Sequence, residues 1–109
     1  MKRAVERSND RPSRIDVGAD FKHDGFAADA GWDVVELRGT FTVSGLSLTN
    51  DAIGDRAAFL DFTLYRHDEL VGTISCSTHP IPHGESGRAD CFSGDDYTAF
   101  DAVAVADTF

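Results

Sequence analysis

Hydrophobic side chains recur at every second position along most of the chain. The clearest case is the run 57–66, in which Leu60, Phe62 and Leu64 alternate with Asp61 and Thr63. A period of two is typical of a β-strand with one buried face. The same period predicts six further strands, at about 15–21, 32–38, 40–48, 70–78, 87–93 and 98–106.

Turn-forming residues separate these runs roughly every eight to twelve residues, as in an all-β sandwich or barrel. Examples are His23-Asp24-Gly25 and His67-Asp68-Glu69. The segment 25–31 (GFAADAG) is the closest approach to a helix, and it predicts a single helical turn at most. We therefore predict an antiparallel β-sandwich of about seven strands.

The first fourteen residues differ from the rest of the chain. They have no apolar period and contain Pro12. They hold five basic and two acidic residues, whereas residues 15–109 hold five basic and seventeen acidic ones. We predict a flexible basic N-terminal tail, residues 1–14, followed by one domain, residues 15–109, a usual domain size.

The charge and the apolar pattern exclude several functions. The net charge is −9, so the domain repels nucleic-acid phosphates. No apolar run approaches the ~18 residues of a membrane-spanning helix. The N-terminus lacks the apolar segment of a signal peptide, which leaves open whether an export leader was removed.

Cys76 and Cys91 are the two cysteines of the chain and lie on consecutive predicted strands. The midpoint between them falls at His83 and Gly84, so two strands folding back there would place the cysteines opposite each other. We predict a disulfide, which would add ~3 kcal/mol of stability and would indicate an oxidising compartment. The alternatives are two buried thiols, a catalytic cysteine, or a zinc site that also uses His79 and His83.

Two neighbouring motifs resemble a known family. The segment 62–65 (FTLY), followed by 70–73 (LVGT), resembles the FxLYD-type domains of prokaryotic, particularly actinobacterial, extracytoplasmic proteins. Arg66 stands where that family has Asp. The resemblance implies an immunoglobulin-like sandwich outside the cytoplasm, and it brings no catalytic residues with it.

Three polar groups have residue types found in metal or catalytic sites, but solvated turns explain each of them better. We therefore expect no catalytic, metal or cofactor-binding site. The groups are Asn50, Asp51 and Asp55 for calcium; His79, His83 and Glu85 for a transition metal; and Asp95, Asp96 and Asp101 for acid–base chemistry.

These observations favour a non-catalytic extracytoplasmic module, secreted or on the cell surface, that binds a protein or another envelope component. The loops 50–56 and 79–86 would present its binding surface. The candidate partner contacts are Phe59, Tyr65, His79 and His83. The alternative is a small structural component of a virion or surface layer, such as a capsid or tail decoration protein, that assembles with itself or with other proteins.

Overall fold

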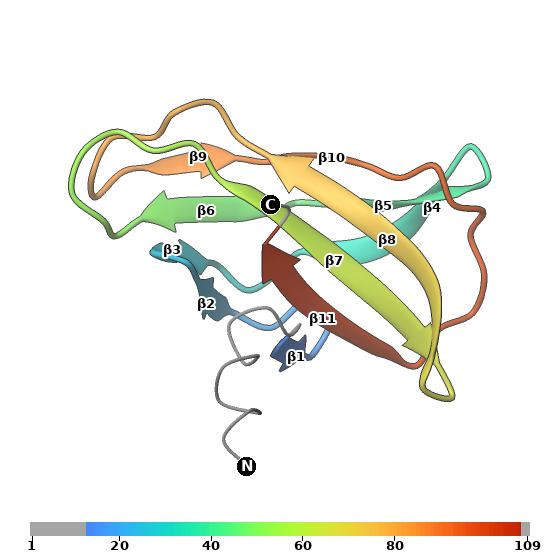
Figure 1. Ribbon diagram of the computed structural model, residues 1–109. Helices are drawn as coiled ribbons and strands as arrows, with labels where there is room; N and C mark the ends of the chain where they lie inside the picture. Colours follow the sequence, from blue (N-terminus) through green and yellow to red (C-terminus); the bar gives the residue numbers. More distant parts are fainter. Residues whose placement is uncertain (1–12, 108–109) are drawn as a thin grey trace, which may run out of the picture.

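A computed structural model of the chain describes residues 13–107, which form eleven antiparallel strands and no helix (Figure 1). One sheet has five strands. Their order across the sheet is β1 (Ser13–Ile15), β11 (Ala102–Asp107), β7 (Phe59–Arg66), β8 (Glu69–Ser77) and β10 (Asp90–Phe92).

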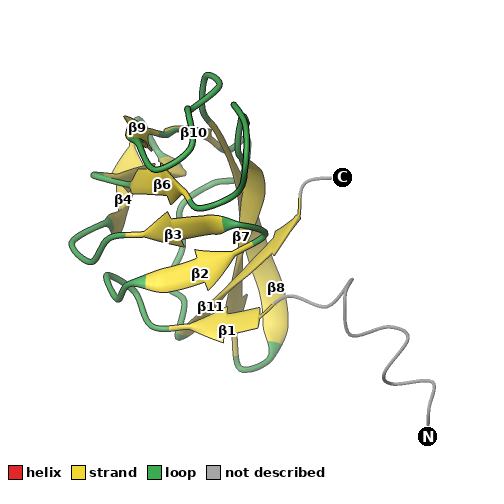
Figure 2. Cartoon of the chain, turned by 90° about the vertical axis from the view of Figure 1, so that its left-hand side faces the viewer, coloured by secondary structure: helices red, strands yellow, loops and turns green. Residues whose placement is uncertain are grey.

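The second sheet has four strands and packs against the first, so the two form the layers of a sandwich (Figure 2). Its order is β2 (Phe21–His23), β3 (Phe26–Ala28), β6 (Ser47–Asn50) and β9 (Ser86–Arg88). A hairpin of β4 (Asp33–Leu37) and β5 (Thr40–Ser44) lies beside β10. The predicted all-β sandwich is confirmed.

Three hairpins have two-residue turns whose central residues both have positive φ. They are Asp24-Gly25 between β2 and β3, Arg38-Gly39 between β4 and β5, and His67-Asp68 between β7 and β8. Positive φ at both positions defines the type I′ turn, whose twist matches that of the flanking strands. The two turns singled out from the sequence, at 23–25 and 67–69, are among these three.

The core contains the inward faces of both sheets. Leu60, Phe62 and Leu64 are each at most 1% exposed, as their alternation predicts. Trp32 packs on Phe62 with ring centroids 5.0 Å apart. Its indole nitrogen donates a hydrogen bond to the carbonyl oxygen of Ala19 at 2.8 Å, which satisfies the polar atom of this buried ring.

The count of about seven strands is wrong, because three predicted strands are each divided and β3 forms where no strand was predicted. The run 40–48 is divided at 45–46, between β5 and β6, which belong to different sheets. The run 15–21 is interrupted by a loop at 16–20 that separates β1 from β2. The run 87–93 is divided at Ala89, where the chain passes from the four-stranded sheet to the five-stranded one. The amide of Ala89 donates to the carbonyl oxygen of Leu46, so the chain stays hydrogen-bonded where it changes sheets.

Three further segments also differ from the prediction, one in its type of secondary structure and two in where a strand begins. The segment 25–31 contains the strand β3 rather than a helical turn, because Phe26 and Ala28 both face the core. The last strand begins at Ala102 rather than near Thr98. Strand β1 takes in Ser13 and Arg14, which the sequence assigned to the tail, and the rest of that tail lies outside the described residues.

Candidate functional site

Two cross-strand rows of side chains cover the outer face of the five-stranded sheet where β7, β8 and β10 lie side by side. Opposite residues in antiparallel strands share a face, and successive residues alternate faces. Leu60, Cys76 and Cys91 point toward the core, so their neighbours along the strands point outward. The first row is Phe59, Ser77 and Asp90; the second is Asp61, Ser75 and Phe92.

The side chains of these rows, except Asp61, line a shallow pocket of about 350 Å³, which we call the aromatic shelf. Ser75 and Ser77 form its floor, Phe59 and Phe92 its two walls, and Asp90 part of its rim. The two rows have the same composition in reverse order, so the phenylalanines stand at diagonally opposite corners.

The two phenylalanine rings are largely open to solvent. Phe92 is 74% exposed and Phe59 is 48% exposed. Single apolar side chains on a protein surface are ordinary, whereas aromatic residues gathered around one pocket are typical of contact sites. The shelf is the place in the described chain where large exposed aromatic side chains line a common pocket.

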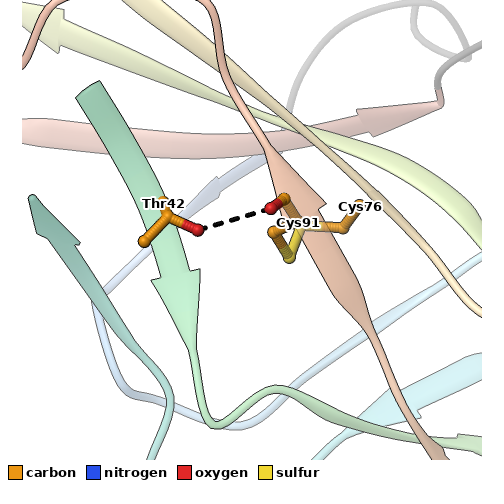
Figure 3. Close-up of a disulfide and its surroundings, with 3 residues drawn as sticks. All are labelled: Thr42, Cys76 and Cys91. Atoms are coloured by element: carbon orange, nitrogen blue, oxygen red, sulfur yellow. Dashed lines mark hydrogen bonds between the residues drawn. A yellow bond between two sulfur atoms is a disulfide. The ribbon is translucent and has the colours of Figure 1, made fainter. Parts of the chain in front are cut away.

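The disulfide between Cys76 and Cys91 lies directly beneath the shelf. Figure 3 shows the bridge together with Thr42 on the neighbouring strand β5. It joins opposite residues of β8 and β10 whose Cα atoms are 4.1 Å apart. On the other side of β10, the hydroxyl of Thr42 donates to the carbonyl oxygen of Cys91 at 3.4 Å. The three-residue strand that carries Asp90 and Phe92 is therefore held from both sides.

The predicted disulfide is confirmed, which excludes free thiols and a zinc site built on them. The two strands meet as their spacing around His83 and Gly84 implies. Because both sulfurs are in the bridge, neither is a thiolate ligand.

The loops 50–56 and 79–86 lie together at the end of the sandwich, tied by backbone hydrogen bonds. Arg56 and Ile81 exchange two of these bonds, and Asn50 exchanges bonds with Gly84 and Glu85. This cluster is separate from the shelf lining.

The four candidate partner contacts do not form one site. Phe59 belongs to the shelf. Tyr65 lies at the opposite end of β7, half-buried under the guanidinium of Arg14, 5.7 Å from the ring centroid. His79 is exposed in its loop, and Nδ1 of His83 lies 2.6 Å from the carbonyl oxygen of Ala52.

Each polar group considered for metals or catalysis has at least one side chain that hydrogen-bonds the backbone of the fold. The side chain of Asn50 points inward and bonds three backbone groups. The carboxylate of Asp95 accepts from the amide of Thr73, and that of Asp101 accepts from the amide of His67. Within residues 13–107, no three His, Cys, Asp or Glu side chains are grouped so that they could hold a metal ion.

Sequence reasoning missed most of the shelf. Asp90, Phe92, Ser75 and Ser77 carry no recognisable motif. The disulfide supplied a usable signal: if Cys76 and Cys91 are opposite and face inward, their neighbours face outward together.

No family model, curated protein or solved structure matches this chain. The part of the chain that the structure describes contains no helix long and apolar enough to cross a membrane. The class of protein that the coordinates define is thus an all-β sandwich with a cross-strand disulfide, and the resemblance to FxLYD-type domains stays a prediction.

Proposed function

We propose that this chain is a non-catalytic binding module that holds a segment of a partner protein on the aromatic shelf. The observation that carries the proposal is the position of Phe92, which is 74% exposed, faces the same pocket as Phe59 and lies on a strand fixed by a disulfide. Burying a Phe side chain is worth roughly 1.5–3 kcal/mol, so a partner that covers the shelf gains from both rings.

The rigidity of the shelf supports this function. Binding loses free energy when side chains and loops must be ordered, and a preformed surface avoids part of that loss. The shelf stands on β7 and β8, the longest strands in the described chain, and the bridge to β10 fixes the second wall.

The use of the carboxylates supports a non-catalytic role. A catalytic acid or base must reach a substrate proton in a cleft. Asp95 and Asp101 instead accept hydrogen bonds from backbone amides and so stabilise turns.

The module would act outside the cytoplasm, either secreted or on the cell surface. Disulfides such as Cys76–Cys91 persist in oxidising compartments and are rare in the cytosol. The resemblance of residues 62–73 to FxLYD-type domains points the same way.

A display library of random peptides tests the proposal. The library is selected on the parent, on Phe92→Ser and on Leu70→Ser. Leu70 is a matched control because it is 59% exposed but lies at the far end of β8. We expect families of peptides that bind the parent and Leu70→Ser and lose binding to Phe92→Ser. Peptides that bind all three proteins equally, or no enrichment on the parent, would overturn the proposal.

A further inference from the structure

Two carboxylates, Asp90 in the shelf lining and Asp61 next to that lining on β7, stand beside the two phenylalanines of the shelf. Asp61 is two residues from Phe59 on β7, and Asp90 is two residues from Phe92 on β10. Two residues along a strand span about 7 Å, and their side chains share a face. Each aromatic wall therefore has a negative charge next to it, on the same surface.

The two rows place a second carboxylate opposite each ring. Asp90 ends the row that begins at Phe59, with Ser77 between them. Asp61 ends the row that contains Phe92, with Ser75 between them. Two strand spacings amount to about 10 Å, so a ligand lying across the serines meets a ring at one end and a carboxylate at the other.

The described part of the chain as a whole has the same sign of charge as these carboxylates. Residues 13–107 hold six Lys and Arg side chains against seventeen Asp and Glu, a net charge of −11. The guanidinium of Arg56 forms an ion pair with the carboxylate of Asp24 and packs over the ring of Phe26. Arg88, exposed two residues before Asp90, is the basic side chain nearest to the shelf along the chain.

A basic side chain of a partner matches this combination. Its cation can pair with a carboxylate and lie over an aromatic face. Its aliphatic stem can cover apolar surface while the charged head stays hydrated. The serine hydroxyls between the rings can accept hydrogen bonds from the same head group.

Resting on the proposed function, we propose that the shelf recognises a basic segment of a partner protein, with an arginine or lysine lying across Ser75 and Ser77 between a phenylalanine and an aspartate. An apolar residue of the segment covers the second ring. Acidic segments are rejected because they meet the carboxylates of the shelf and the negative charge around it.

The sequences of the selected peptides give the first test. Peptides that need Phe92 should be enriched in Arg and Lys relative to the unselected library. A Phe92-dependent set without that enrichment would overturn the basic segment and leave the proposed function standing. Loss of the Phe92-dependent set itself would instead overturn the proposed function.

Titration of the strongest selected peptide gives the second test, with its binding followed by fluorescence anisotropy. Asp90→Asn should weaken binding about two- to fivefold, as expected for a partly exposed ion pair, and Phe92→Ser should weaken it about fivefold or more. Asp55→Asn is the control, because it removes the same charge from an exposed loop residue that does not line the shelf. Added salt should reduce affinity for the parent more than for Asp90→Asn.

A neutral version of the peptide, with citrulline in place of arginine, completes the design. It should bind the parent more weakly and respond little to Asp90→Asn. If Asp90→Asn and Asp55→Asn bind alike, or if the citrulline peptide binds as well as the basic one, the inference fails. Thermal melts of each variant verify that the proteins compared are folded.

Discussion

The side-chain amide nitrogen of Asn50 donates a hydrogen bond to the carbonyl oxygen of Ile81 at 2.7 Å, between two loops far apart in the sequence. The same nitrogen bonds the carbonyl oxygen of Gly54, and the side-chain oxygen accepts from the amide of Ala52. Asn50 is completely buried. A single side chain thus satisfies three backbone groups and joins the loops 50–56 and 79–86.

Replacing Asn50 with alanine should lower the free energy of unfolding by about 1–3 kcal/mol, because the bonded backbone groups lose their partner in a buried position. Urea denaturation measures the loss. Thr49→Ala is the control, since its hydroxyl bonds Ser86 nearer the surface, and its cost should stay below that of Asn50→Ala. Equal losses for the two variants would show that Asn50 does not anchor the loops.

Gly72 on β8 is packed directly against the ring of Phe41. A Cβ atom at this position would lie 2.5 Å from the ring. Phe41 is fully buried and contacts the rings of Tyr97 and Phe100, so it has little room to move. Gly72→Ala should therefore cost about 1–3 kcal/mol through overpacking.

Thermal melting of Gly72→Ala alongside Gly94→Ala checks this. A Cβ at Gly94 would meet no atom within 4 Å, so the control should melt close to the parent. If the two variants melt together, the contact between Gly72 and Phe41 is not as close as described.

The alternation along β7 predicts losses of stability of different size for neighbouring residues. Leu64 is completely buried, and Thr63 faces outward and is partly exposed. Leu64→Ala should cost about 2–5 kcal/mol, the usual range for a core leucine. Thr63→Ala should cost less than about 1 kcal/mol. Chemical denaturation of both variants compares them, and a loss below 1 kcal/mol for Leu64→Ala would mean that its side chain is not in the core.

The strands that could be predicted are those in which the local pattern and the packing agree. In β7, the period of two selects the face that the sandwich buries. The loop at 16–20 could not be predicted in this way, because Ile15, Val17 and Phe21 keep the same period across it. A local turn ends β1: the amide of Ala19 donates to the carbonyl oxygen of Asp16, and Gly18 has a positive φ. Non-local bonds then hold this loop, because the indole nitrogen of Trp32 and the amide of Gly31 donate to the carbonyl oxygens of Ala19 and Gly18.

The functional face was harder to predict because it depends on register. Phe59 is recognisable from its place on β7, but Phe92 joins it only because Ser75 pairs with both Asp61 and Phe92. Such pairings involve residues far apart in the sequence, and no local propensity reports them. Tyr65 occupies the same alternate positions of β7 as Phe59 but lies at the other end of the strand. The direction in which a side chain points is therefore not enough to identify the site.

The bridge between Cys76 and Cys91 should stabilise the domain and the shelf together. Replacing both cysteines with alanine should lower stability by about 2–4 kcal/mol, since the bridge closes a loop with a sequence separation of 15. Hydrogen exchange should then rise first in β10, which keeps the outward positions of Asp90 and Phe92. Reductant should lower the melting temperature of the parent toward that of the double variant and leave the variant unchanged. A parent that melts at the same temperature with and without reductant would show that the strand pairing holds β10 without the bridge.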